Sequence, residues 1–209
     1  MCTSDPVFQT QKVYDAIAKD YAYRNKTPND KVLHSLQTFA DMLPPGGRVL
    51  DVGCAEGRET EWFLQKGFSV VGCDFNDTFI RMARKRCPSA TFITADMRAL
   101  PAHIGTFDGL WACASFLHIP KQNALQTLQG FKAVLKPGGI MYIGVLKGTF
   151  EGMRENVKMG WAPRHFSDYE IHELNGLLHE AGFEAIQIID SPRPGTALSF
   201  LNVFAKRAN

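Results

Sequence analysis

Hydrophobic positions alternate between two kinds of pattern through the middle of this 209-residue chain. Short, nearly continuous apolar runs such as 68–75 and 107–114 are typical of strands buried on both faces of a sheet. Between such runs, segments 77–86 and 120–135 carry apolar residues at the three- and four-residue spacing of an amphipathic helix. This alternation predicts β-α units around a parallel sheet.

The pattern changes near the carboxyl terminus. Ser167-Asp168-Tyr169-Glu170 resembles a capping box and predicts a helix that ends at Ala181. Segments 183–189 and 197–205 are predicted strands, and their connector is too short for a helix, so they must pair antiparallel. The predicted fold is therefore an α/β three-layer αβα sandwich. Its seven-stranded, mostly parallel sheet ends in an antiparallel C-terminal hairpin.

Composition narrows the class of protein. The chain is 45% hydrophobic and 21% charged, as expected for one globular domain. A net charge of +2 gives no electrostatic case for nucleic acid or an anionic membrane. We expect a cytoplasmic protein because there is no membrane-spanning run and no basic-apolar leader at the amino terminus. The five cysteines lack metal-ligand spacing, so reduced thiols are expected and a metal site is not.

The chemistry-bearing stretch begins at a strand over residues 49–52, which runs into a glycine-rich turn over 53–57 and then a helix. This arrangement points backbone N–H groups and the positive end of a helix at the carboxyl edge of the sheet. Small side chains in the turn let a ligand approach the main chain closely. Asp51 stands at the strand tip, where its carboxylate can face a cationic amino group.

A second acid follows the next strand. Asp74 lies about twenty residues beyond the glycine turn, the separation expected for a carboxylate that accepts both hydroxyls of a ribose. The ligand is therefore predicted to be a nucleoside. Asp51 and Glu56 would repel the pyrophosphate of a dinucleotide, whereas a methionine ammonium and a sulfonium would be attracted.

The segment Asp51-Val52-Gly53-Cys54-Ala55-Glu56-Gly57 resembles motif I of the class I, Rossmann-like S-adenosylmethionine (SAM)-dependent methyltransferases, whose usual form is acid-x-Gly-x-Gly-x-Gly. Ala55 replaces the middle glycine, which adds one methyl group. Leu135-Lys136-Pro137-Gly138-Gly139 before a strand, and a Tyr14–Tyr21 segment similar to the "YDxIAxxY" lid of small-molecule methyltransferases, extend the resemblance.

The resemblance implies one methyltransferase domain over residues 1–209. It divides into an N-terminal helical lid, a SAM-binding core, an acceptor-binding insertion, and a C-terminal helix with its hairpin, spanning residues 1–45, 46–146, 147–166 and 167–209. Helices are predicted at 11–23 and from Pro28 to Leu43 within the lid. A plain amphipathic helix packed on the sheet edge is the alternative for the first of these.

The resemblance also implies SAM as cofactor and S-adenosylhomocysteine (SAH) as product. Asp51 and the turn should surround the methionine part, Asp74 the ribose, and Asp96 the adenine amino group. The alternative for Asp96 is that it caps the short turn that follows it. The predicted cofactor-binding residues are Asp51, Gly53, Cys54, Ala55, Gly57, Asp74, Phe75, Asp96, Met97, Ala112 and Cys113.

The acceptor side is predicted less specifically. His118 follows the fourth strand, where related enzymes carry residues beside the transferable methyl group, and a histidine there can act as general base. His165 and Glu151 in the insertion are further catalytic candidates, although both histidines could be structural and the insertion a surface loop. The predicted substrate-binding residues are Tyr14, Tyr21, His118, Glu151, Trp161, Arg164, His165 and Phe166.

These residues predict methyl transfer to an O or N atom of a small molecule, by a monomer or homodimer that requires neither nucleic acid nor membrane. One alternative is an RNA-modifying enzyme, because some wobble-uridine methyltransferases share an Arg-aromatic pattern like Arg164-His165-Phe166. A second is a SAM-binding protein without turnover. A third and remote alternative is a nicotinamide-dependent enzyme.

Overall fold

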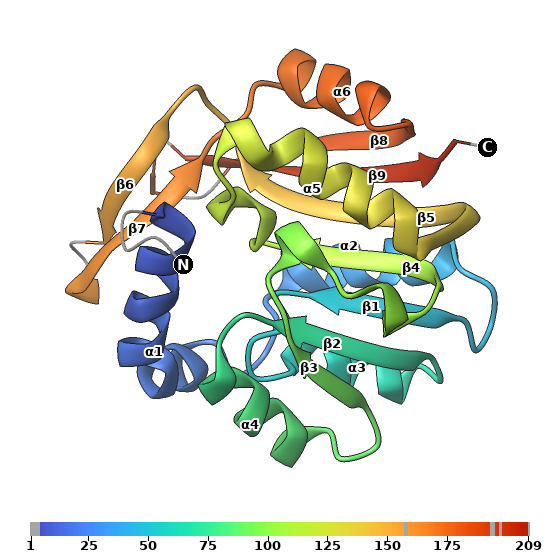
Figure 1. Ribbon diagram of the computed structural model, residues 1–209, viewed down its shortest axis with the longest axis horizontal. Helices are drawn as coiled ribbons and strands as arrows, with labels where there is room; N and C mark the ends of the chain where they lie inside the picture. The colour runs from blue at the N-terminus through green and yellow to red at the C-terminus, as the bar shows by residue number, and fades with distance from the viewer. Residues whose placement is uncertain (1–4, 157–158, 193–194, 197, 209) are drawn as a thin grey trace.

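The computed structural model describes residues 5–156, 159–192, 195–196 and 198–208. A seven-stranded sheet with the order β3-β2-β1-β4-β5-β9-β8 forms its centre (Figure 1). The strands of this sheet are β1 Arg48–Val52, β2 Ser69–Asp74, β3 Thr91–Thr94, β4 Phe107–Cys113, β5 Leu135–Leu146, β8 Phe183–Pro192 and β9 Ser199–Arg207. The first five pair in parallel, whereas β9 runs antiparallel to both β5 and β8. The predicted α/β fold and its antiparallel hairpin are confirmed.

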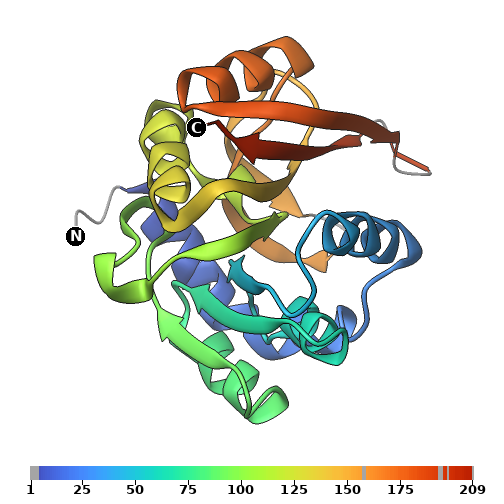
Figure 2. The same ribbon diagram turned by 90° about the vertical axis from the view of Figure 1, so that its right-hand side faces the viewer.

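Helices cover both faces of the sheet. They are α1 Pro6–Arg24, α2 Asp30–Asp41, α3 Arg58–Gln65, α4 Asp77–Arg86, α5 Lys121–Val134 and α6 Ile171–Glu180, with short 3-10 turns at Met97–Ala99, Ala102–Ile104 and Phe116–His118. Helices α5 and α6 lie on one face of the sheet and α2 and α3 on the other (Figure 2). None of these helices combines the length and apolar character needed to cross a bilayer, as far as the described residues extend.

Alternating side chains of the central strands build the two cores. Leu50 belongs to the core beneath α5, whereas its neighbour Val49 belongs to the core beneath α2, as the two-residue period of a strand requires. In the α2 core the rings of Trp111 and Tyr142 stack with centroids 3.9 Å apart, and Phe39 packs against Trp111. Apolar residues on both faces explain why these strands read as continuous hydrophobic runs.

The insertion after β5 is a β-hairpin and not the surface loop that was the alternative for it. Its strands β6 (Glu151–Asn156) and β7 (Trp161–Ser167) form a separate two-stranded antiparallel sheet. The hairpin lies beside α1 at the carboxyl-end edge of the main sheet (Figure 1). Strand β7 packs against a helix far away in the sequence, which a local apolar pattern could not reveal.

Two predicted element boundaries are wrong. Ser167 is the last residue of β7, where its Oγ donates to the carbonyl of Ile119, so it does not cap the next helix. The capping box is formed by Glu170 and Glu173 instead, and α6 begins at Ile171. The segment 135–139, which we expected to end a helix as a loop, is the first part of β5.

Candidate functional site

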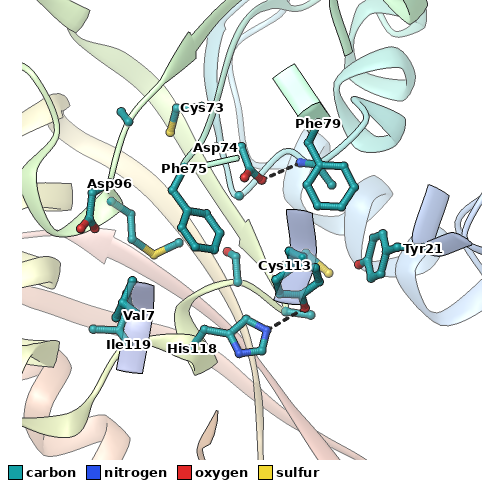
Figure 3. A pocket seen from close by; sticks show the side chains of 17 residues that line it. Val7, Tyr21, Cys73, Asp74, Phe75, Phe79, Asp96, Cys113, His118 and Ile119 are labelled. Carbon is teal, nitrogen blue, oxygen red and sulfur yellow. Dashed lines mark hydrogen bonds between the residues drawn. The ribbon is translucent and has the colours of Figure 1, made fainter. Parts of the chain in front are cut away.

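A cavity with an empty volume of about 630 Å³, including space open to solvent, lies at the carboxyl ends of β1, β2 and β4 (Figure 3). This is the edge at which open α/β sheets bind their ligands. The sheet side is lined by Gly53, Ala55, Cys73, Asp74, Phe75, Ala95, Asp96, Met97, Cys113, Ala114 and Ser115. The other side is lined by Val7, Tyr14, Tyr21, Phe79, His118 and Ile119.

The glycine-rich turn forms one wall of this cavity. Gly53 has a φ of 75°, and a Cβ added there would lie 2.3 Å from the Cβ of Ser115, so only glycine fits without a shift of the backbone. Ala55 also has a positive φ, 45°. This conformation turns the N–H of Ala55 toward the carboxylate of Asp74, and the two groups are 3.0 Å apart. The turn and the tip of β2 are therefore one hydrogen-bonded unit.

Asp74 is buried at the tip of β2, and its carboxylate faces the cavity. Oδ2 accepts the N–H of Ala55, and Oδ1 accepts the N–H of Asn76 at 2.9 Å. Burial raises the pKa of Asp74 to about 6, although the two N–H groups act in the opposite direction. An ionised carboxylate with lone pairs left over can accept two neighbouring hydroxyl groups.

Other acids crowd around the same turn. Asp51 lies behind it, outside the cavity lining, and accepts a hydrogen bond from Thr60 Oγ1 at 2.6 Å. Burial, and to a lesser extent the nearby Glu59, raise the pKa of Asp51 to about 8. Burial also raises the pKa of Glu56, whose Oε1 has no hydrogen bond in the described structure but lies 3.7 Å from Arg86 Nη1 as an ion pair. Of Asp51, Glu56 and Asp74, only Asp74 lines the cavity.

Phe75, Asp96 and Met97 form the end of the cavity next to β3. Phe75 projects between Asp96 and Phe79 (Figure 3). The Asp96 carboxylate accepts the N–H of Arg98 at 2.9 Å, so it caps the short turn as the structural alternative predicted. Its side chain nevertheless lines the cavity. Asp96 therefore both caps the turn and lines the cavity. Its contact with adenine stays a prediction.

Four predicted cofactor residues do not line the cavity: Asp51, as described above, and Cys54, Gly57 and Ala112. Cys54 is buried in a cluster with Ile80 and Phe92, on the side away from the ligand edge. Gly57 is the N-cap of α3, and Ala112 lies within β4. Cys113, immediately after Ala112, does reach the cavity.

Tyr14 and His118 both line the cavity and are hydrogen-bonded to each other. Tyr14 Oη lies 2.9 Å from His118 Nε2, and His118 Nδ1 lies 2.6 Å from the carbonyl oxygen of His165. Because a carbonyl only accepts, Nδ1 donates to it, so Nε2 accepts the proton of the Tyr14 hydroxyl. Burial, together with the charge of Arg164, lowers the pKa of His118 to about 3, so the ring is neutral.

The hairpin holds α1 over the cavity through three polar contacts. Arg164 Nη1 donates to Tyr14 Oη at 2.7 Å, Trp161 Nε1 donates to Asp20 at 3.0 Å, and the N–H of His165 donates to Thr10 Oγ1 at 2.9 Å. The Tyr21 and Trp161 rings also touch, with centroids 5.9 Å apart. Phe166 packs against His118 at 4.7 Å. The predicted substrate residues on α1 and β7 are thus brought together.

His165 and Glu151 are not brought to the cavity lining. His165 Nε2 lies 3.1 Å from Ser167 Oγ, and Glu151 accepts the N–H of Lys121 at 2.7 Å. The two side chains are 3.9 Å apart, near each other but outside the cavity wall. Within the described residues no group of three or more His, Cys, Asp or Glu side chains could hold a metal ion.

Comparison with known proteins agrees with this geometry. Residues 49–139 match the family model described as "Methyltransferase domain". The chain is 29% identical over 161 residues to methyltransferase GfsG of Streptomyces halstedii, covering 69% of this chain and 55% of that protein. Against mouse tRNA (carboxymethyluridine(34)-5-O)-methyltransferase ALKBH8 it is 24% identical over 191 residues, 90% of this chain and 27% of that protein.

A solved structure extends the match to the whole fold. The 1,6-didemethyltoxoflavin-N1-methyltransferase of Burkholderia thailandensis superimposes with a TM-score of 0.77 at 22% identity, over 100% of this chain and 92% of that one. Residues 49–139 thus match a methyltransferase domain, and the chain has the fold of the class I SAM-dependent methyltransferases. It spans little more than half the length of GfsG and about a quarter of ALKBH8.

Several residues of this methyltransferase cavity escaped the sequence analysis. Ala114 and Ser115 follow Cys113, and Ser115 Oγ donates to the carbonyl of Val52 at 2.7 Å, which ties β4 to the tip of β1. Their place directly after a strand tip was the signal that could have found them. Val7 and Phe79 line the cavity from helices, where an apolar residue looks like an ordinary core position.

Proposed function

We propose that the protein is an enzyme that binds SAM in this cavity and transfers its methyl group to an O or N atom of a small molecule. The observation that carries the proposal is the buried Asp74 carboxylate, which the N–H groups of Ala55 and Asn76 hold at the cavity wall. In that position it can accept both hydroxyl groups of a ribose.

The residues around the turn fit this cofactor. The acids Asp51, Glu56 and Asp74 all have pKa values raised chiefly by burial, and SAM would bring an ammonium and a sulfonium close to them. Phe75 and Met97 offer apolar surface for adenine at the other end of the cavity. The whole cluster of acids would gain from a cationic ligand and would repel a pyrophosphate.

When bound, SAM supplies an electrophilic methyl group, which is transferred by an in-line displacement. The task of the chain is therefore to position the two reactants and to exclude water. Helix α1 covers the cavity, and Val7, Tyr14 and Tyr21 on it supply a largely apolar wall. We assign Tyr14 and His118 to the acceptor atom: Tyr14 Oη can take the proton that the acceptor loses while Tyr14 passes its own proton to His118 Nε2, which already accepts its hydrogen bond.

His165 and Glu151 stay as proposed catalytic residues of lower rank, because neither lines the cavity. His165 nevertheless holds the His118 ring through its carbonyl group. A direct chemical role for either side chain would require an acceptor that extends beyond Phe166.

Two measurements test the proposal. Calorimetry with SAM and with SAH should detect binding to the folded protein, and a metabolite library incubated with isotope-labelled SAM should yield a product heavier by one methyl group. Binding without any product across the library would favour a SAM-binding protein without turnover. The absence of binding to either nucleoside would refute the proposal.

A second candidate function is methylation of tRNA. The match to ALKBH8 extends over 90% of this chain, including the segment Arg164-His165-Phe166. A net charge of +2 weighs against it, because an RNA-binding surface normally carries a strong positive field. Retention on tRNA that falls steeply with salt concentration, together with methylation of that tRNA, would favour this function over the first.

A further inference from the structure

Two arginines face each other across the β6–β7 hairpin. Arg154 and Arg164 are directly paired in the antiparallel register, and both guanidinium groups lie near the same ring, Phe166, at 5.1 and 5.3 Å from its centroid. Like charges in directly opposite positions of two strands repel each other. The arrangement is therefore favourable only where anions compensate both charges.

Arg154 has such an anion. Its Nη2 lies 2.6 Å and its Nη1 3.2 Å from the two carboxylate oxygens of Asp168, a bidentate pair with a buried acid. Paired guanidinium and carboxylate groups of this geometry neutralise each other and are common in protein interiors.

Arg164 has none. It is more deeply buried, at 6% exposure, yet among the described residues no carboxylate oxygen lies within 4.0 Å of its nitrogen atoms. Every Asp and Glu side chain of the sequence belongs to the described part of the chain. A buried cation without an anionic partner is rare in folded proteins because its desolvation is not compensated.

The polar contacts of Arg164 are also incomplete. Its one hydrogen bond within the described structure runs from Nη1 to Tyr14 Oη, and its buried Nε has no partner. The rings of Tyr14, Trp161 and Phe166 surround the guanidinium at 5.0 to 5.3 Å and compensate the charge only in part. A guanidinium group offers five donors, so most of its binding capacity is unused.

This unbalanced charge lies at the acceptor end of the cavity. Tyr14 and His118 line that end, and Arg164 stands one hydrogen bond behind Tyr14. The hydroxyl group of Tyr14 now donates to His118 and can turn its proton toward an arriving anion while it still accepts from Arg164. The neutral His118 ring adds no opposite charge.

We propose that the acceptor is a small molecule that bears a carboxylate, with Tyr14 as its first contact and Arg164 as its counter-ion. The inference rests on the proposed function, since the acceptor is the second substrate of that reaction. The single positive charge of Arg164 balances the single negative charge of a carboxylate. A phosphate dianion would leave one negative charge uncompensated and would be repelled by the acids around the turn.

Binding to the SAH-saturated protein tests this proposal by calorimetry and by the fluorescence of Trp161. The probes are benzoate and phenylacetate, with benzamide and phenylacetamide as matched neutral controls and phenyl phosphate as the alternative anion. At least one carboxylate should bind while its amide does not. Arg164→Met should weaken that binding by roughly 30-fold or more, and Arg164→Lys, which keeps the charge but loses the guanidinium group, by less.

Arg154→Lys is the matched control, because it changes the opposite arginine of the hairpin and keeps the pairing with Asp168. It should leave carboxylate binding unchanged. The proposal is overturned when no carboxylate binds, when the amides or phenyl phosphate bind as well, or when binding survives Arg164→Met. SAH binding is measured separately in each variant, so a failure of the cofactor site is distinguished from a failure of the acceptor assignment.

Discussion

Replacement of Asp74 by asparagine is the sharpest test of the cofactor site. The carboxylate already accepts two backbone N–H groups, and the proposed ribose contact adds two hydroxyl groups. A hydrogen bond to a charged acceptor contributes about 1.5–3 kcal/mol. Asparagine keeps one oxygen and places an NH₂ group where the other oxygen was. We therefore expect Asp74→Asn to cost about 2–3 kcal/mol of SAH binding, roughly a 30- to 150-fold rise in Kd.

The pH dependence of SAH binding gives the same test a second readout. The free protein has an Asp74 pKa of about 6, and the ribose contact requires the ionised form. At pH 5 about one molecule in eleven is ionised, so affinity should be about tenfold lower than at pH 7. Asp74→Asn should remove this part of the pH dependence. Asp77→Asn, an acid three residues further on that does not line the cavity, is the control.

The folding stability of Asp74→Asn shows whether a loss of SAH binding is local to the site or is caused by unfolding. The folded-state pKa of Asp74 lies above its ordinary value of 3.8, so the folded protein holds that proton more firmly than the unfolded chain. The ionised carboxylate therefore costs about 3 kcal/mol of folding free energy above about pH 6, and this cost disappears as the pH falls toward 4. Its removal in Asp74→Asn offsets the lost N–H contact of about 1–2 kcal/mol.

The thermal midpoint of Asp74→Asn at pH 7.5 should accordingly stay within a few degrees of the wild type. Unchanged SAH affinity in a folded Asp74→Asn protein, or an equal loss in Asp77→Asn, would refute the assignment of the ribose to Asp74. So would a wild-type affinity that stays constant between pH 5 and 7.

Three further substitutions test other parts of the site. His118→Ala should lower turnover at least about tenfold and leave SAH affinity nearly unchanged; parallel losses in both would contradict its acceptor-side role. Gly53→Ala forces a Cβ to within 2.3 Å of Ser115 and should cost about 1–3 kcal/mol in urea unfolding; wild-type stability would show that the turn relaxes freely. Arg154→Met leaves the buried Asp168 unpaired and should cost about 2 kcal/mol or more, whereas Arg164→Met should cost less; the reverse order would mean that Arg164 is mainly structural.

The position of the cavity at the ends of the parallel strands was predictable because its signals are local. Each acid that follows a strand, Asp51, Asp74 or Asp96, marks a strand tip within a few residues of sequence. Parallel strands end at one edge of a sheet, so these tips had to converge. The sequence alone could not show which of these acids reaches the cavity. Asp51 lies behind the turn, whereas Asp74 lines the cavity.

The acceptor half depends on contacts between segments that are far apart. Arg164 meets Tyr14 across 150 positions, and His118 meets the His165 carbonyl across 47. Strand β7 buries the polar residues Arg164 and His165, so it lacks the alternation of apolar and polar residues that identifies a strand. The capping error has a similar cause, since Ser167 and Glu170 have the spacing of a cap but Ser167 is held in the hairpin.

Helix α1 couples the two halves of the site. Tyr14 packs its ring against Phe79 in the cofactor cavity, while its hydroxyl group joins His118 and Arg164 on the acceptor side. Tyr14 therefore cannot move away from His118 and Arg164 without also losing its contact with Phe79 in the cavity wall. An anion that satisfies Arg164 strengthens the contact between β7 and α1, and so holds that wall closed. Binding of the acceptor should for this reason slow the release of SAH, and by thermodynamic linkage SAH should tighten the binding of the acceptor by the same factor.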